Sequence, residues 1–356
     1  MTFRLTIDGP AWARAGHEVA ARTPGLVPVI KGNGYGFGPA LLAQRSTELG
    51  VPAVAVGVMA EIPPVRAHFA GEILVMTPLQ LAEVGAAGPA NRGVLRTVAH
   101  PAVLRAVAAL ADPPPVVLEL DSPVHRHGIT RRDLLDLVFL LRRVPFAGIA
   151  LHLPLDQADH DRLRAAESAL QSMGTLRAAG VRPSTLWISH LDVAGVTQLT
   201  RQDPLTRIRS RIGTRLWLVD GGASYGASGA VLDRRPVSRH QTIGYRQRRS
   251  PAGTLLVVSG GTAHGVGLYT SVAHGGWRDL ARGALSGAVH GAGLARSPFH
   301  WAGQRLRYAD VPHMQVSMLL VPTGVPAPLV GDRLPCDVRM TVTTFDEIEV
   351  RELHAI

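Results

Sequence analysis

Lys31 is the only lysine in this chain of 356 residues, and the other 36 of its 37 basic side chains are arginines. A lysine amine can lose its proton and form a Schiff base with an aldehyde or ketone, whereas an arginine guanidinium stays protonated and is a poor nucleophile. A coding bias towards arginine could also leave one lysine by chance. The count alone therefore assigns no role, and the residues around Lys31 decide between the two interpretations.

The segment that contains Lys31 is typical of a strand followed by a ligand-binding turn. Residues 27–30 are apolar and valine-rich, which predicts a buried strand that ends at Lys31. Four glycines follow within residues 32–38, and a helical pattern begins at residue 39. Glycines let a ligand approach the backbone, and a helix start favours an anion such as phosphate. A Schiff-base amine beside a phosphate site indicates pyridoxal 5′-phosphate (PLP), which needs both.

Residues 27–38, VPVIKGNGYGFG, resemble the lysine motif V-x-K-A-N-A-Y-G-x-G of alanine racemase and its fold-type III PLP relatives. The lysine, the asparagine, the tyrosine and the last two glycines stand in register. The resemblance implies that Lys31 binds PLP covalently and acts as one catalytic base. It also implies that Tyr35 hydrogen-bonds the cofactor phosphate, and that the protein is a homodimer acting on an amino acid.

Two further segments extend the resemblance towards the substrate. Residues 119–128 resemble the family's K-x-D-T-G-M-x-R-L-G. That match implies that Arg126 contacts the substrate carboxylate, a ligand that suits a guanidinium. Glu119 then supplies the carboxylate that many relatives obtain from a carbamylated lysine. Residues 147–152 resemble G-x-x-T-H-F, which implies that His152 packs against the pyridine ring. Taken singly, Arg126 could be a surface residue and His152 a core residue.

Two later segments imply how PLP is held at its ring nitrogen and phosphate. Ser189 stands where the family binds phosphate through an Asn-Ser pair, and residues 211–214 resemble the family's R-x-G-I. By that resemblance Arg211 faces the pyridine nitrogen, and Gly213 and Thr214 bind phosphate. A permanent cation beside that nitrogen disfavours protonation of the ring, so the ring becomes a weaker electron sink.

The C-terminal part matches the family less well. Alanine racemase carries a G-Y-x-D-G motif whose tyrosine acts as second base from the partner subunit, and residues 258–265 here contain no tyrosine. His264 is the nearest group able to exchange protons near neutral pH, and it is the predicted second base. It could equally be an ordinary loop histidine, and Tyr245 and Tyr269 lie nearby in the sequence.

Residues 313–318, HMQVSM, resemble the substrate-binding C-M-D-Q segment of the family. The match implies that Met314 and Gln315 contact substrate, with Gln315 in place of the acidic residue. The family's C-terminal phosphate-binding tyrosine has no counterpart. The resemblance therefore supports the cofactor more strongly than it supports a particular reaction or substrate.

Eight strand-like segments alternate with helical ones in residues 1–230, which predicts an α/β fold with a (β/α)₈ barrel. A smaller β-rich domain is predicted over residues 231–356, with a long loop or helical insertion at residues 270–308, and residues 1–9 alternate like a strand. The predicted barrel strands are 27–31, 52–58, 72–77, 93–99, 115–121, 146–152, 185–189 and 206–211. The predicted helices are 39–49, 79–86, 101–111, 131–142 and 157–179.

Composition limits the remaining possibilities. The net charge is +10, but the arginines are scattered and no aromatic residues interleave with them, so nucleic acid is not the expected partner. The chain has one cysteine, no run of 18 apolar residues and no signal-peptide core, which predicts a cytoplasmic protein without an internal disulfide. No metal site is expected.

The leading hypothesis is a PLP-dependent amino-acid racemase or epimerase. Two alternatives stay open: another fold-type III reaction, such as decarboxylation or elimination, and a non-catalytic PLP-binding protein. Exchange of the substrate α-proton with solvent deuterium separates an enzyme from a binding protein.

Overall fold

The computed structural model describes residues 2–86, 93–268 and 296–352, and they divide into two compact units. One unit comprises residues 13–34 and 38–219. The other comprises residues 1–12, 35–37 and 220–356. The division differs from the predicted boundary at residue 230, because the N-terminal segment and residues 220–230 belong with the C-terminal part. Most of the predicted insertion, residues 270–295, lies outside the described residues.

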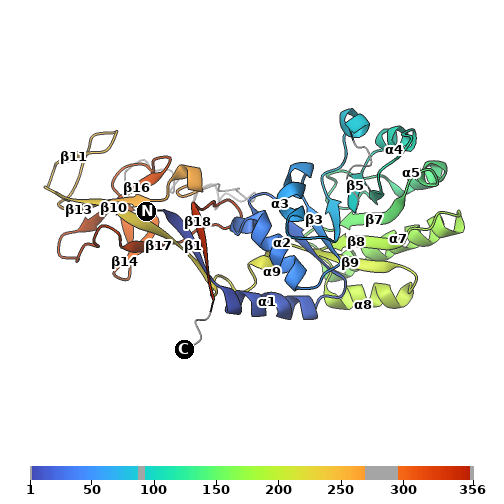
Figure 1. The fold of residues 1–356 in the computed structure, drawn as a ribbon, viewed down its shortest axis with the longest axis horizontal. Helices are drawn as coiled ribbons and strands as arrows, with labels where there is room; N and C mark the ends of the chain where they lie inside the picture. The colour runs from blue at the N-terminus through green and yellow to red at the C-terminus, as the bar shows by residue number, and fades with distance from the viewer. Residues whose placement is uncertain (1, 87–92, 269–295, 353–356) are drawn as a thin grey trace. The chain divides into compact units, whose positions relative to one another are not determined.

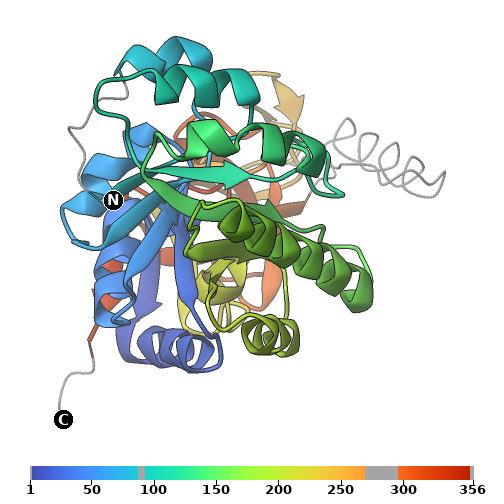
Figure 2. The same ribbon diagram turned by 90° about the vertical axis from the view of Figure 1, so that its right-hand side faces the viewer.

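The first unit is a closed barrel of eight parallel strands, which confirms the predicted (β/α)₈ fold. Strand β2 pairs with β3 on one side and with β9 on the other, and this last pairing closes the barrel. Figure 1 shows helices α7 and α8 on the outside of strands β7 to β9, and Figure 2 shows the barrel after a quarter turn. The strands are β2 (Leu26–Ile30), β3 (Ala53–Val56), β4 (Glu72–Val75), β5 (Val94–Val98), β6 (Val116–Glu119), β7 (Phe146–His152), β8 (Thr185–Ser189) and β9 (Arg207–Ile212).

Most barrel strands are buried on both faces, which explains why several of them read as continuous apolar runs, whereas β9 (RIRSRI) alternates arginine with isoleucine and serine. Every residue of β2 and β3 is buried. Small residues of β3 leave room inside the barrel, and Trp187 of β8 fills it as the largest fully buried side chain. The packed interior leaves the ends of the strands as the place where polar side chains can meet a ligand.

The helices that surround the barrel follow the predicted pattern with local differences. The predicted helix at 79–86 is a 3₁₀ turn, and the one at 131–142 divides at Leu137. Prolines 63 and 64 occupy the first turn of a helix only five residues long. Helices α1 and α8 had not been predicted. The elements are α1 (Gly9–Ala21), η1 (Gly34–Gly36), α2 (Pro39–Glu48), η2 (Met59–Glu61), α3 (Ile62–Arg66), η3 (Leu81–Ala86), α4 (Pro101–Ala108), α5 (Arg131–Asp136), α6 (Val138–Leu141), α7 (Asp159–Ala178), α8 (Val193–Gln202) and α9 (Thr214–Trp217).

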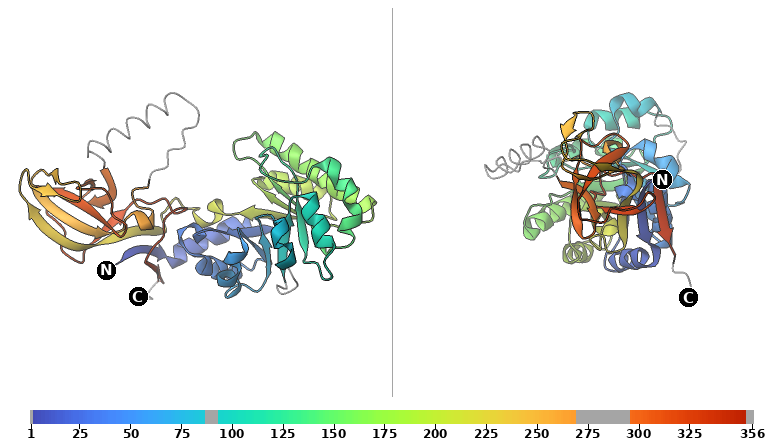
Figure 3. Two further views of the ribbon diagram at one scale, coloured as in Figure 1. Left: turned by 90° about the horizontal axis from the view of Figure 1, so that it is seen from above. Right: turned by 90° about the vertical axis from the view of Figure 1, so that its left-hand side faces the viewer.

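The second unit is an eight-stranded sheet, which confirms the predicted β-rich domain. Its order is β13-β16-β15-β14-β17-β10-β1-β18, and a further pairing of β13 with β10 closes a circuit of six strands. Figure 3 shows these yellow to red strands with the blue N-terminal strand beside them. The strands are β1 (Phe3–Asp8), β10 (Tyr225–Val237), β13 (Gly253–Ser259), β14 (Arg296–Trp301), β15 (Gln304–Tyr308), β16 (Val316–Pro322), β17 (Arg333–Cys336) and β18 (Glu347–Arg351), with a separate β11 (Thr242–Ile243), β12 (Arg248–Arg249) pair and the turn η4 (Thr262–His264).

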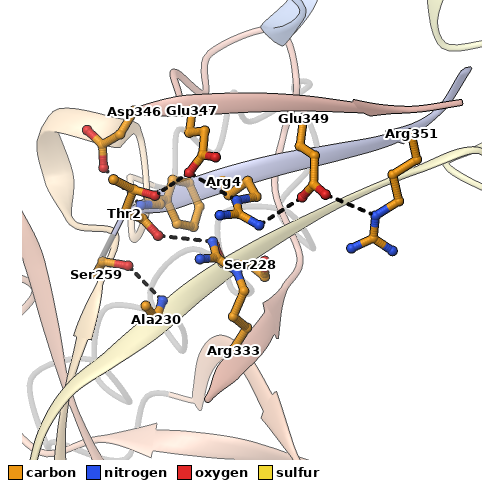
Figure 4. Close-up of polar contacts among 11 residues, drawn as sticks. Thr2, Arg4, Ser228, Ala230, Ser259, Arg333, Asp346, Glu347, Glu349 and Arg351 are labelled. Atoms are coloured by element: carbon orange, nitrogen blue, oxygen red, sulfur yellow. Dashed lines mark hydrogen bonds and ion pairs between the residues drawn. The ribbon is translucent and has the colours of Figure 1, made fainter. Parts of the chain in front are cut away.

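Ion pairs explain why the N-terminal strand belongs to this sheet (Figure 4). Arg4 of β1 contacts Glu347 at 3.0 Å and Glu349 at 2.8 Å, both on β18. Arg333 of β17 donates hydrogen bonds to the carbonyl oxygens of Thr2, at 3.0 Å, and of Ser228, at 2.8 Å. The predicted strand at residues 1–9 is therefore present as β1, between β10 and β18. No helix among the described residues is both long and apolar enough to span a membrane.

Candidate functional site

A cavity of about 910 Å³ opens at the carboxyl ends of the barrel strands. Parallel strands end on one rim of a barrel, so side chains that are distant in the sequence meet there. The charged and histidine side chains that line this cavity come from five strand ends and their loops: Lys31, His100, Glu119, Arg126, His127, His152 and Arg211. Apolar residues of the loops after β4 and β5, together with polar Thr77 and Gln80, line most of the rest of the cavity. The structure thus brings together four of the predicted site residues, namely Lys31, Arg126, His152 and Arg211.

Lys31 directly follows β2 and its side chain is exposed at the cavity. The turn after it runs through residues 32, 34, 35, 36 and 38, all of which have φ between 54° and 87°. Four of them are glycines, which adopt this conformation without steric cost. A side chain at Gly34 would also place its Cβ 2.7 Å from the Pro39 nitrogen. Tyr35 is the non-glycine exception; it is buried and groups with the second unit.

His152, Ser189 and Arg211 lie at one level across three neighbouring strands. His152 of β7 is paired with Ser189 of β8, and Ser189 is paired with Arg211 of β9. The His152 and Arg211 side chains line the cavity, whereas Ser189 is buried and does not. Gly213 and Thr214 follow at the start of the four-residue α9.

Arg211 is a buried cation with incomplete hydrogen bonding. The residue is 4% exposed, and its Nη2 donates to the Leu151 carbonyl at 3.0 Å. Its Nη1 lies 3.8 Å from Oε2 of Glu119, which is 3% exposed. Desolvation lowers the pKa of Arg211, and the Glu119 carboxylate opposes that shift. The buried Nε has no hydrogen-bond partner among the described residues, so it is a donor that needs an acceptor.

Three histidines beside the cavity, His127, His152 and His190, have lowered pKa values. Burial, followed by the charge of Arg211, lowers the pKa of His152 to about 3. Burial is also the largest cause that lowers the pKa of His190 and of His127. The rings of His152 and His190 meet edge to face with centroids 5.0 Å apart. The charge of the site therefore comes from Lys31, Arg126 and Arg211 against Glu119, which leaves a net attraction for anions.

Arg126 lies in a loop whose base is closed by hydrogen bonds. The Ile129 amide donates to the Glu119 carbonyl at 2.9 Å, and the Asp121 amide donates to the Ile129 carbonyl at 3.1 Å. Gly128 has a φ of 148°, and a side chain there would put its Cβ 2.3 Å from the Asp121 nitrogen. The sequence resemblance at residues 119–128 thus corresponds to a loop that presents Arg126 to the cavity mouth.

The remaining predicted residues belong to the second unit. His264 is 5% exposed, and its Nδ1 accepts a hydrogen bond from the Gly261 amide at 3.2 Å. Its Nε2 must then carry the proton and donate to Oδ1 of Asp346, at 3.0 Å. Both ring nitrogens are therefore engaged in a structural arrangement, which competes with the predicted role of second base. That role stays a prediction.

Met314 and Gln315 are exposed in the same unit. Their carbonyl oxygens accept hydrogen bonds from the amides of Ala263, at 2.9 Å, and Gly260, at 3.0 Å. The two segments singled out in the C-terminal part of the sequence are therefore hydrogen-bonded neighbours, and the substrate contacts predicted for Met314 and Gln315 stay predictions.

Two residues near the cavity were missed by sequence reasoning. His190 follows Ser189 and contacts His152, and its place after a predicted barrel strand could have indicated it. Glu61 accepts hydrogen bonds from the backbone beside Lys31, at the amide of Gly32. A carboxylate that binds a backbone amide 29 residues away leaves no motif in a single sequence.

The family model described as "Alanine racemase, N-terminal domain" matches residues 8–202 of the chain. No curated protein matches the chain significantly. Among solved structures, the alanine racemase of Bacillus anthracis with bound L-Ala-P has a TM-score of 0.70 and 18% identity, and the match covers 94% of this chain and 84% of that one. The alanine racemase of Bartonella henselae, with covalently bound pyridoxal phosphate, has a TM-score of 0.67, 17% identity and coverages of 95% and 91%. That of E. faecalis has a TM-score of 0.68, 18% identity and coverages of 98% of both chains. At these identities the solved structures show a common fold.

Proposed function

The chain belongs to the alanine racemase family, and from this premise we propose that it is a PLP-dependent amino-acid racemase or epimerase. The observation that carries the proposal is that Lys31, the sole lysine, and the buried Arg211 line the same cavity. A solved relative, the Bartonella henselae alanine racemase, carries covalently bound pyridoxal phosphate. We further propose a cytoplasmic homodimer, in keeping with the family resemblance.

The residues present fit PLP. The unpartnered Nε of Arg211 is a buried donor in need of an acceptor, and an unprotonated pyridine nitrogen is such an acceptor. The excess of positive charge at the cavity suits the phosphate and the substrate carboxylate. Bound PLP supplies an electron-withdrawing ring that makes the α-proton of an attached amino acid acidic.

Each side chain then has a defined task. Lys31 would hold PLP through a Schiff base and, once released by substrate, would accept or return the α-proton from one face. Arg126 would bind the substrate carboxylate, and neutral His152 would pack against the ring without acting as an acid. Arg211 would donate to the ring nitrogen, with Glu119 compensating its charge. Tyr35, Ser189, Gly213 and Thr214 are proposed for the phosphate, and Met314 and Gln315 for the substrate.

Racemisation also needs an acid or base on the opposite face of the α-carbon. We keep His264 as the candidate, although its two ring nitrogens are hydrogen-bonded within its own unit. The missing tyrosine at residues 258–265 is the observation that favours the second candidate function, a fold-type III reaction with one base, such as decarboxylation or elimination.

Cofactor attachment is the first test of the proposal. The purified protein should be yellow, and borohydride reduction followed by peptide mass spectrometry should find the reduced PLP adduct on Lys31. The variant Lys31→Arg keeps the positive charge and should take up no reducible PLP, because arginine cannot form the bond. A colourless wild-type protein that binds no PLP would overturn the proposal.

A further inference from the structure

Glu61 links the end of β2, where Lys31 stands, to the end of the neighbouring strand β3. It ends the short turn η2, and its Oε1 accepts the Gly32 amide at 2.6 Å. Its Oε2 accepts the amides of Gly57, at 2.6 Å, and Val58, at 3.2 Å. One carboxylate thus receives three backbone N–H groups, one from the residue after Lys31 and two from the loop after β3. Hydrogen bonds of this charge-assisted kind are shorter and stronger than neutral ones.

Glu61 binds the backbone just beyond the point where the pairing of β2 with β3 ends. The pairing of β2 with β3 ends at Ile30 and Val56, so Lys31 and Gly57 are the first residues outside the ladder. A side chain at Gly57 would place its Cβ 3.2 Å from the Cβ of Lys31 and 3.0 Å from Glu61 Oε2. The lysine backbone and the end of β3 therefore approach each other closely, and the Glu61 carboxylate holds them at that separation.

The other flank of β2 is also held. Trp217, at the end of α9, donates from its indole Nε1 to the Val29 carbonyl at 2.9 Å. Residues 26–28 pair with β9 on the same side. The end of β2 is thus held by contacts on the β9 side and on the β3 side. Of the contacts just described, only that of Glu61 reaches a residue beyond Lys31.

We propose that Glu61 is the positioning residue of Lys31, which fixes the amine for covalent attachment of PLP. Glu61 is not among the residues that line the cavity, so it acts through Gly32 and not on a ligand. The inference rests on the proposed function of Lys31. In the attachment, the Lys31 nitrogen forms a double bond to the aldehyde carbon, and the aldehyde oxygen leaves as water with the two protons of the neutral amine. Formation of this bond depends steeply on the position of the amine, since a displacement of about 1 Å between reacting groups can lower a reaction rate roughly 100-fold.

The experiment compares two ligands in three variants. PLP can bond to Lys31, whereas pyridoxine 5′-phosphate has the same ring and phosphate but no aldehyde. Glu61→Gln keeps the shape but replaces one carboxylate oxygen by an N–H donor, so one arm of the link is lost; Glu61→Ala removes both. Asp203→Asn is the control, since Asp203 accepts the Leu205 amide at 3.1 Å and the Thr206 hydroxyl at 2.7 Å, and pairs with Arg177, just before β9 at the other end of the barrel. Thermal unfolding of each variant checks the fold.

We expect the dissociation constant of PLP to rise about 10- to 100-fold in Glu61→Ala and less in Glu61→Gln, as for lost charge-assisted hydrogen bonds. The dissociation constant of pyridoxine 5′-phosphate should stay within about twofold of the wild-type value, and Asp203→Asn should change neither ligand. Equal weakening of both ligands, or no weakening of either, would show that Glu61 does not position Lys31 and would leave the proposed function intact. If the wild type itself forms no adduct with PLP, the proposed function fails, and the role of Glu61 falls with it.

Discussion

At the scale of single residues, the site is built around a buried cation that needs compensation. Arg211 is nearly inaccessible, and Glu119 is the acidic group that opposes its loss of hydration. A buried charge that loses its partner costs far more than the same loss at the surface. The family resemblance of residues 119–128 and 211–214 indicated both side chains in the sequence. It could not predict that the Nε of Arg211 would lack a partner, since that depends on the packing around it.

Replacement of Glu119 by glutamine should lower the stability of the protein more than an equivalent change at the surface. Glu119→Gln leaves Arg211 buried without its counter-charge, and we expect a loss of about 3 kcal/mol in the free energy of unfolding. Asp233→Asn is the control, because Asp233 pairs with Arg235 at 2.7 Å and the two side chains are 42% and 74% exposed; it should cost less than about 1 kcal/mol. Urea denaturation of both variants measures the difference, and equal losses would contradict the account.

His264 has two possible roles that one variant separates. A second base would make His264→Ala retain α-proton exchange with one enantiomer and lose it with the other by roughly 10²- to 10⁴-fold. A structural histidine would leave the ratio of the two exchange rates unchanged and lower stability, because the Gly261 amide and Asp346 lose their partner. Exchange of each enantiomer in deuterium oxide, with thermal unfolding alongside, decides between them.

At the scale of elements, strand register decides which side chains share an environment. His152, Ser189 and Arg211 fall at one level because β7, β8 and β9 are paired in that register. Alternation of strands and helices predicted that their ends would meet, but not that His190 would lie against His152. That contact depends on the loop after β8, where His190 adopts a φ of 64°.

The partly buried His152 and His190 should make the protein less stable in mild acid. The folded-state pKa of His152 is about 3, against about 6.5 in an unfolded chain, so the unfolded state binds more protons between these values. The free energy of unfolding must therefore fall as the pH falls below about 6.5. His152 alone accounts for up to about 2 kcal/mol between pH 7 and pH 5. Urea titrations at both pH values should show a smaller fall for His152→Gln, and an identical fall would refute the assignment.

At the scale of the whole molecule, the barrel could be predicted from the sequence. Of the second unit, only its β-rich character could be predicted, and its strand order could not. Most barrel strands repeat the same pattern of a short apolar run before a helix, and that repetition identifies the fold. The alternating N-terminal segment predicted a strand without indicating its partner. β1 pairs with β10 and β18, hundreds of residues away, through contacts such as those of Arg4. Non-local pairing of this kind explains why the predicted boundary at residue 230 differs from the two units.

The central claim is that Lys31, with bound PLP, moves the α-proton of an amino acid. The most direct measurement is the incorporation of deuterium at the α-carbon of separate L- and D-amino acids by the holoenzyme, followed by mass spectrometry and chiral separation. The account predicts exchange with both enantiomers, appearance of the opposite enantiomer, and loss of all exchange in Lys31→Arg. Exchange with one enantiomer only would contradict racemisation and support a one-base reaction. An absence of exchange with every amino acid, in a protein that carries PLP on Lys31, would contradict the claim itself.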